Sequence, residues 1–140
     1  MAVKTYDPKQ VAVIIGTRAA SGYAEGSFVK VERNNDAFAL MVGADGEATR
    51  AKSADKSGKI TITLLASSDY NDYLSELALA DELTGGGIVP ALIKDNSGRS
   101  LHTSATCWVM KMPTNDFAKD NGTREWVIET DELIMFTGGN

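Results

Sequence analysis

An alternating stretch, Lys59-Ile60-Thr61-Ile62-Thr63-Leu64, most constrains what this chain can fold into. Its apolar side chains recur at every second residue. In an extended backbone Ile60, Ile62 and Leu64 therefore lie on one face and the polar side chains on the other. Such a strand packs one face on a core and turns the other towards more polar surroundings. The stretch predicts an antiparallel β-strand in a sheet that is covered on one face.

Other short segments of similar character predict further strands. Turn-forming clusters such as Asn34-Asn35-Asp36 and Asp95-Asn96-Ser97-Gly98 separate some of them. Besides residues 59–65, the predicted strands are 10–16, 28–33, 37–42, 88–94, 100–112, 125–130 and 133–136. About eight strands without a strand–helix alternation predict a mainly β fold, an antiparallel sandwich or barrel.

One segment changes from the strand period to the helical period. Residues 68–83 begin with capping residues, place acids in the first turn and end before Gly85-Gly86-Gly87. The side chains expected on the core-facing side are Tyr70, Tyr73, Leu74, Leu77 and Ala80. The segment predicts a single helix that flanks the sheet, with Asp69, Asp72 and Glu76 on a neighbouring solvated face.

Residues 43–58 contain no large apolar side chain, although they lead directly into the alternating strand. Within them, residues 47–52 alternate in the manner of a strand, with Arg50 and Lys52 on one face. We expect a long projecting hairpin that turns near residues 54–57 and reaches roughly 20–25 Å. A two-stranded ribbon is marginal alone in water. It is therefore either an arm that meets another copy of the chain through its mixed charges or a solvated hairpin without a partner.

Length and charge narrow the class of protein further. The 140 residues are sufficient for one domain with its own core. The net charge is −5, and residues 60–93 hold five acids and no lysine or arginine, which leaves fourteen charges of each sign elsewhere. An acidic chain without a basic cluster disfavours tight nucleic-acid binding, because that binding depends on lysine and arginine at the phosphates.

The chain has no apolar run long enough for a membrane span and no signal peptide at its start, so we expect a protein that matures in a reducing cytoplasm. Its one cysteine, Cys107, excludes an internal disulfide and lies in a strand-like segment, where we expect a buried thiol.

Catalytic and ligand motifs are weak. A serine–histidine–acid site would depend on His102, the only histidine, which lies in a polar strand and is more typical of a sheet surface. The segment at Asp45-Gly46 lacks the ligand ladder of a calcium loop, and residues 16–22 lack the ending of a phosphate loop. The sequence thus predicts no enzyme, no cofactor and no metal site.

Several segments, in order along the chain, resemble the tail tube protein family of contractile-tailed bacteriophages. They are Tyr6-Asp7-Pro8-Lys9-Gln10-Val11, Ser21-Gly22-Tyr23-Ala24-Glu25-Gly26-Ser27-Phe28-Val29-Lys30-Val31-Glu32-Arg33, Val42-Gly43-Ala44-Asp45-Gly46-Glu47-Ala48-Thr49-Arg50, the alternating strand, and Arg124-Glu125-Trp126-Val127-Ile128-Glu129-Thr130. Because the resemblance spans nearly the whole chain, it is more specific than any one motif.

The resemblance implies a structural virion protein whose hexameric rings stack into the inner tube of the tail, a conduit for the genome. It implies an N-terminal arm (residues 1–9) and a hairpin (43–58) that reach neighbouring subunits. The candidate contact residues are Tyr6, Asp7, Pro8, Asp45, Glu47, Arg50, Lys52, Asp55 and Lys56.

Other partners implied by the family are the tail sheath, a baseplate initiator and a tape-measure protein. DNA would pass through the tube without specific binding, and assembly would take place in the host cytoplasm without membrane insertion. The resemblance assigns none of the acids to the lumen.

Three alternatives stay open. The first, which the resemblance implies, is another virion or secretion part on the same fold: a type VI or phage-like bacteriocin tube, or a tube-terminating protein. The second is a small β-domain that binds a ligand or nucleic acid, and the third is an enzyme with a pocket around His102.

Overall fold

The structure is a computed structural model that describes residues 3–139. A short 3₁₀ turn, η1 (Pro8–Gln10), precedes the first strand, and one helix, α1 (Tyr70–Thr84), lies mid-chain. The strands are β1 (Val11–Ile15), β2 (Arg18–Ala19), β3 (Val29–Arg33), β4 (Phe38–Val42), β5 (Ala48–Lys52), β6 (Gly58–Leu65), β7 (Val89–Asp95), β8 (Leu101–Lys111), β9 (Thr123–Thr130) and β10 (Ile134–Phe136).

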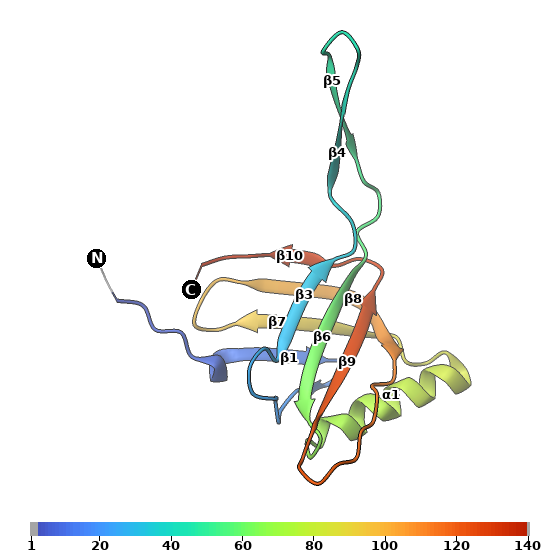
Figure 1. Ribbon diagram of the computed structural model, residues 1–140. Coiled ribbons are helices and arrows are strands. Elements are labelled where there is room, and N and C mark those ends of the chain that lie inside the picture. Colours follow the sequence, from blue (N-terminus) through green and yellow to red (C-terminus); the bar gives the residue numbers. More distant parts are fainter. Residues whose placement is uncertain (1–2, 140) are drawn as a thin grey trace.

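Eight of the strands form one antiparallel sheet, in the order β2-β1-β7-β8-β9-β6-β3, with β10 paired to β8. The long strand β8 joins two parts of this sheet. Residues near its start pair with β7 and β10, and residues near its end pair with β9. The sheet therefore folds over, so that β3, β6 and β9 cross β1, β7 and β10 in Figure 1. The predicted mainly β antiparallel class is confirmed.

The core lies inside the folded sheet. The side chains of Ile60, Ile62 and Leu64 are completely buried, which confirms the face predicted from their alternation. On the paired strand β9, Trp126 lies opposite Ile62 and is also buried. Its indole N–H donates a hydrogen bond of 2.8 Å to Oδ1 of Asn71, so the polar end of this large ring is satisfied.

Helix α1 covers one end of the sheet (Figure 1). It begins at Tyr70, two residues later than predicted, where the N–H of Tyr70 donates to Oγ of Ser68 at 3.2 Å. It ends at Thr84, one residue beyond the predicted end, and is capped as predicted by Gly85, which has a φ of 72° and donates its N–H to the carbonyl of Asp81 at 2.8 Å.

The core-facing side of α1 differs from the prediction at two positions, Ala78 and Ala80. Tyr70, Leu74 and Ala78 are buried, whereas the predicted Ala80 is exposed. The reason is that the buried stripe steps by four residues from Tyr70, and Ala80 lies off that row. Among the described residues no helix is both long and apolar enough to cross a bilayer.

The hairpin is real, but its predicted turn is wrong. Strands β4 and β5 pair with each other, from Phe38 opposite Lys52 to Val42 opposite Ala48, so the turn lies at residues 43–47 rather than 54–57. In this loop the N–H of Gly43 donates to the carbonyl of Glu47 at 2.7 Å, and Gly46 has a φ of 91° that favours glycine. The segment expected to be the far strand and tip, residues 53–57, instead returns the chain to the main sheet.

Candidate assembly surfaces

Residues 34–57, here called the arm, project from the body of the molecule (Figure 1). Every residue of β4 and β5 is exposed. The exposed fractions of Leu40, Met41 and Val42 are 70%, 65% and 61%. Contiguous exposed apolar side chains of this kind mark a surface that another molecule covers.

The pairing of β4 with β5 gives the arm two different faces. One face, called the Phe38 face, carries Phe38, Leu40, Val42, Ala48, Arg50 and Lys52. The opposite face carries Met41 with small residues such as Thr49. The guanidinium of Arg50 lies over the ring of Phe38, 4.1 Å from its centroid. The Phe38 face therefore combines apolar side chains with two cations.

Hydrogen bonds fix the base of the arm to the main sheet. The N–H of Asn34 donates to the carbonyl of Ser57 at 3.1 Å, and its side-chain amide donates to Glu129 Oε1 at 2.9 Å. The Arg33 guanidinium donates to the carbonyl of the buried Leu133 at 2.8 and 3.2 Å. The direction in which the arm leaves the body is thus held by polar contacts on both of its connecting segments.

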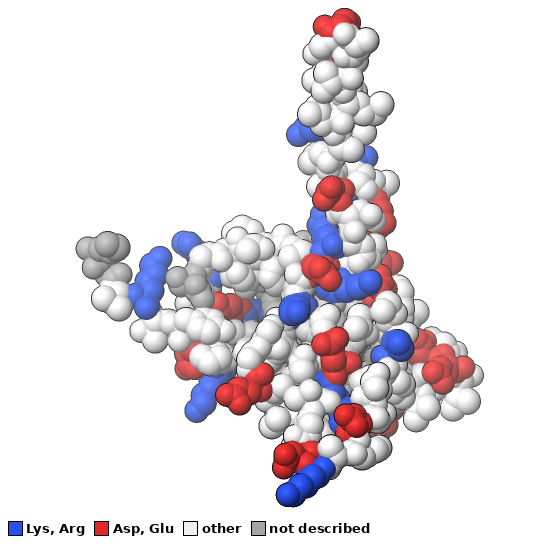
Figure 2. All heavy atoms as spheres, in the orientation of Figure 1, with Lys and Arg blue, Asp and Glu red and all other residues white. Residues whose placement is uncertain are grey.

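The predicted contact residues of residues 43–58 divide into three groups. Asp45 and Glu47 lie in the loop at the tip, where Figure 2 shows acidic atoms above a mostly uncharged arm. Arg50 and Lys52 lie on the Phe38 face.

Asp55 and Lys56 lie at the base instead. Hydrogen bonds from Ser57 hold the pKa of the exposed Asp55 carboxyl below its usual value. The carbonyl of Lys56 accepts the N–H of Leu133 at 2.8 Å. Lys56 therefore secures the arm to the body of its own chain, and Asp55 bonds to Asn35 and Ser57 within the base of the arm.

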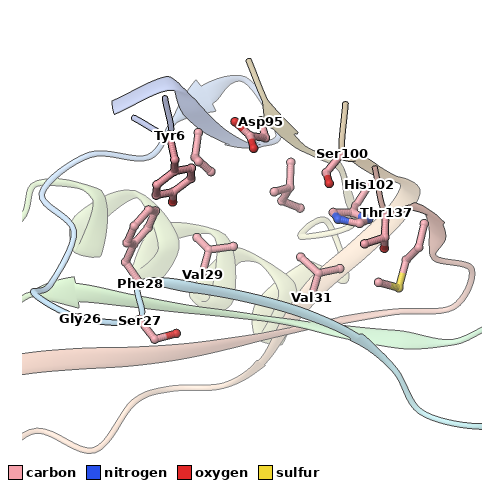
Figure 3. Close-up of a pocket in the computed structure, with 13 residues that line it drawn as sticks. Tyr6, Gly26, Ser27, Phe28, Val29, Val31, Asp95, Ser100, His102 and Thr137 are labelled. Carbon is pink, nitrogen blue, oxygen red and sulfur yellow. The ribbon is translucent and has the colours of Figure 1, made fainter. Parts of the chain in front are cut away.

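The N-terminal candidates lie against the same molecule. The carboxylate of Asp7 accepts the N–H of Lys9 at 3.0 Å and caps η1, which begins at Pro8. Tyr6 lies beside Phe28 at one end of a cavity (Figure 3). Residues 1 and 2 of the predicted N-terminal arm lie outside the described residues.

This cavity, called the β3–β10 groove, has a volume of about 430 Å³ and is lined by residues of β3 and of β1, β7, β8 and β10. Figure 3 shows Val29 and Val31 of β3 pointing into it from one side, with Ser100, His102 and Thr137 on the other. Both bordering strands are sheet edges among the described residues, because β3 pairs with β6 alone and β10 with β8 alone. The sequence did not reveal this groove, since its walls come from strands far apart in the chain.

His102 is half-buried in the groove rather than on an open sheet surface. Burial lowers the pKa of its imidazole, and its Nδ1 atom is buried without a hydrogen-bond partner. Within residues 3–139, no cluster of histidine, cysteine and acidic side chains could hold a metal ion. Cys107 is fully buried, as predicted, and burial raises the pKa of its thiol to about 12.

Comparison with known proteins gives this architecture a family. A sequence model described as "Bacteriophage PhiTE tail tube protein" matches residues 7–138. The chain is also 37% identical over 144 residues to the structural protein ORF10 of Pseudomonas phage KPP10, covering 97% of this chain and 83% of that protein.

Solved structures share the fold at much lower identity. The tube-terminating cap of the anti-feeding prophage aligns with a TM-score of 0.65 at 11% identity, over 98% of this chain and 95% of that one. A chain of the PVC sheath–tube complex in the extended state, from an extracellular contractile injection system, aligns with a TM-score of 0.57 at 12% identity, over 94% of this chain and 91% of that one.

Proposed function

The chain belongs to the bacteriophage PhiTE tail tube protein family, and on that premise we propose that its copies stack as hexameric rings into the inner tube of a contractile tail. The protein is a structural component of the virion and not an enzyme. The tube is a conduit through which the genome passes into the host cell. Assembly takes place in the host cytoplasm, with the sheath outside the tube and a baseplate initiator and tape-measure protein as further partners.

The arm is the observation that carries this proposal. A protein that works as a monomer gains nothing from a strand whose large apolar side chains all face water. The arm exposes four large apolar side chains to water until a second molecule covers them: Phe38, Leu40, Met41 and Val42. The candidate occupants are neighbouring copies, because a tube offers the same surface in every subunit.

The free strand edges support the same proposal. An unpaired edge is a template for addition of another strand, and soluble monomers normally protect such edges. In this chain β3 and β10 each have a free edge within the described residues. The arm and the edges are different surfaces, so a contact between them is heterologous, and contacts of that kind build rings and open-ended stacks.

Electron microscopy of the concentrated protein tests the function. We expect hollow tubes built of six-fold rings, with a central channel. Single rings that never stack would favour the tube-terminator alternative, and a monodisperse monomer at every concentration would overturn the proposal. A tail fraction from intact virions, probed with an antibody to this chain, provides the matching test in the assembled particle.

A further inference from the structure

We propose that the β3–β10 groove is the receptor for the Phe38 face of the arm of a second copy of this chain. This inference rests on the proposed function, and it adds the surface on which the arm docks. Each chain then carries one donor and one acceptor, so every copy in a stack is bound in the same way.

The groove can accept apolar side chains from outside. It is a concave surface with a volume of about 430 Å³ that is open to solvent, and Val29 and Val31 of β3 line it. Its walls are mostly apolar, so apolar side chains would fill it with a gain in buried area.

The backbone at the mouth of the groove also suits a strand. Within residues 3–139, β3 and β10 each have one edge without a strand partner, and residues of both strands line the groove. An extended segment that enters here can pair its backbone with a free edge and place alternate side chains in the cavity. Phe38, Leu40 and Val42 alternate in this way on β4.

The arm cannot fill the groove of its own chain. Its base is held by the bonds from Asn34 to Ser57 and from Arg33 to Leu133, and it points away from the body (Figure 1). Folding back would break these bonds. The arm is therefore available only to another copy.

Charge favours the Phe38 face over the opposite face of the arm. The Phe38 face carries the cations Arg50 and Lys52. The described lining of the groove includes the carboxylate of Asp95 and no lysine or arginine. Opposite charges at the rim of an interface fix its register and disfavour the reversed orientation.

Site-directed crosslinking in co-assembled protein tests the docking surface. One variant carries Leu40→Cys on the Phe38 face, and the other carries Thr137→Cys or Ser27→Cys at the rim of the groove. All three positions are exposed, so the substitutions leave the fold intact. The native Cys107 is buried and stays unreactive. Met41→Cys, on the opposite face of β4 and equally exposed, is the matched control for Leu40→Cys.

We expect oxidation to give a disulfide-linked dimer from Leu40→Cys with a groove variant, at least several-fold more than from Met41→Cys. If tubes form but Leu40→Cys and Met41→Cys crosslink equally, or if neither crosslinks, the groove is not the receptor. The proposed tube function would stand in both cases. If the unmodified protein forms no rings or tubes, the proposed function fails and this inference falls with it.

Discussion

The guanidinium of Arg50 lies 4.1 Å from the centroid of the Phe38 ring, across the two strands of the arm. A cation over an exposed aromatic ring contributes about 0.5–1 kcal/mol. That is too little to keep a two-stranded ribbon rigid alone in water. Arg50 and Phe38 therefore matter more to the surface that the arm presents than to the stability of the body.

Reversing both cations of the Phe38 face tests this distinction. In the double variant Arg50→Glu/Lys52→Glu we expect the free energy of unfolding of the monomer to stay within about 1 kcal/mol of the original, because exposed charges contribute little. We expect tube formation to fall at least tenfold by light scattering. The control Lys94→Glu/Lys119→Glu makes the same change in net charge at exposed positions outside the arm. Equal loss of assembly in both variants would contradict a specific role for the arm.

Removing the arm gives a second, independent prediction. Residues 37–53 are replaced by a short glycine–serine link, which keeps the hydrogen bond between Asn34 and Ser57 at the base. Because every residue of β4 and β5 is exposed, the core is unchanged and the monomer should unfold at nearly the same temperature. Electron microscopy should show no tubes. Tubes of normal length from this variant would mean that the arm is not an assembly contact.

The contrast between the core and the arm shows what the sequence could predict. The period of two in β6 predicts that Ile60, Ile62 and Leu64 are buried, and the helical period of α1 predicts that Leu74 is buried. Such patterns depend only on the local backbone. The core and the fold class were therefore predictable without knowing which strands are neighbours.

The arm and the groove depend on pairing, which the local pattern does not contain. Three polar clusters, near Asn34, Asp45 and Asp55, all resemble turns, and only the partner of β4 decides which one is the tip. The pair Asp45-Gly46 was a usable sequence signal for the turn of the hairpin. Gly46 adopts a positive φ there, and the Asp45 carboxylate accepts the N–H of Glu47 at 3.1 Å. The walls of the groove come from β3 and from β1, β7, β8 and β10, so His102 could not be placed beside Val31 from sequence.

The contact between α1 and β1 gives a prediction for stability. The Tyr70 hydroxyl accepts the N–H of Ile15 at 3.2 Å and donates to the carbonyl of Arg18 at 3.0 Å. In Tyr70→Phe the buried N–H of Ile15 and the part-buried carbonyl of Arg18 lose their partner, so we expect a loss of about 1–3 kcal/mol in the free energy of unfolding. Urea denaturation of the monomer measures it. Tyr6→Phe, at a side chain that is 53% exposed, should change it by less than about 0.5 kcal/mol.

Gly58, the first residue of β6 after the arm, has no room for a side chain. A Cβ there would lie 2.4 Å from Cδ2 of Leu133 and 2.7 Å from the carbonyl oxygen of Glu32. Gly58→Ala should therefore destabilise the protein by about 1–3 kcal/mol through overpacking. Gly122→Ala, where nothing lies within 4 Å of the new atom, is the matched control in the same denaturation experiment. Equal stability of both variants would show that the strands can shift to make room.

The groove histidine predicts a specific response to acid. Burial lowers the pKa of His102, so the folded protein binds this proton less readily than the unfolded chain does. Stability should therefore fall as the pH drops below the ordinary histidine value of about 6.5, and the fall should end at the lower pKa of the folded state. His102→Gln removes this contribution but leaves every carboxylate in place. We expect urea denaturation at about pH 7.5 and about pH 5.5 to show a smaller acid-induced loss in the variant than in the original protein. An identical loss in the two proteins would mean that the imidazole in the groove is protonated as easily as in the unfolded chain.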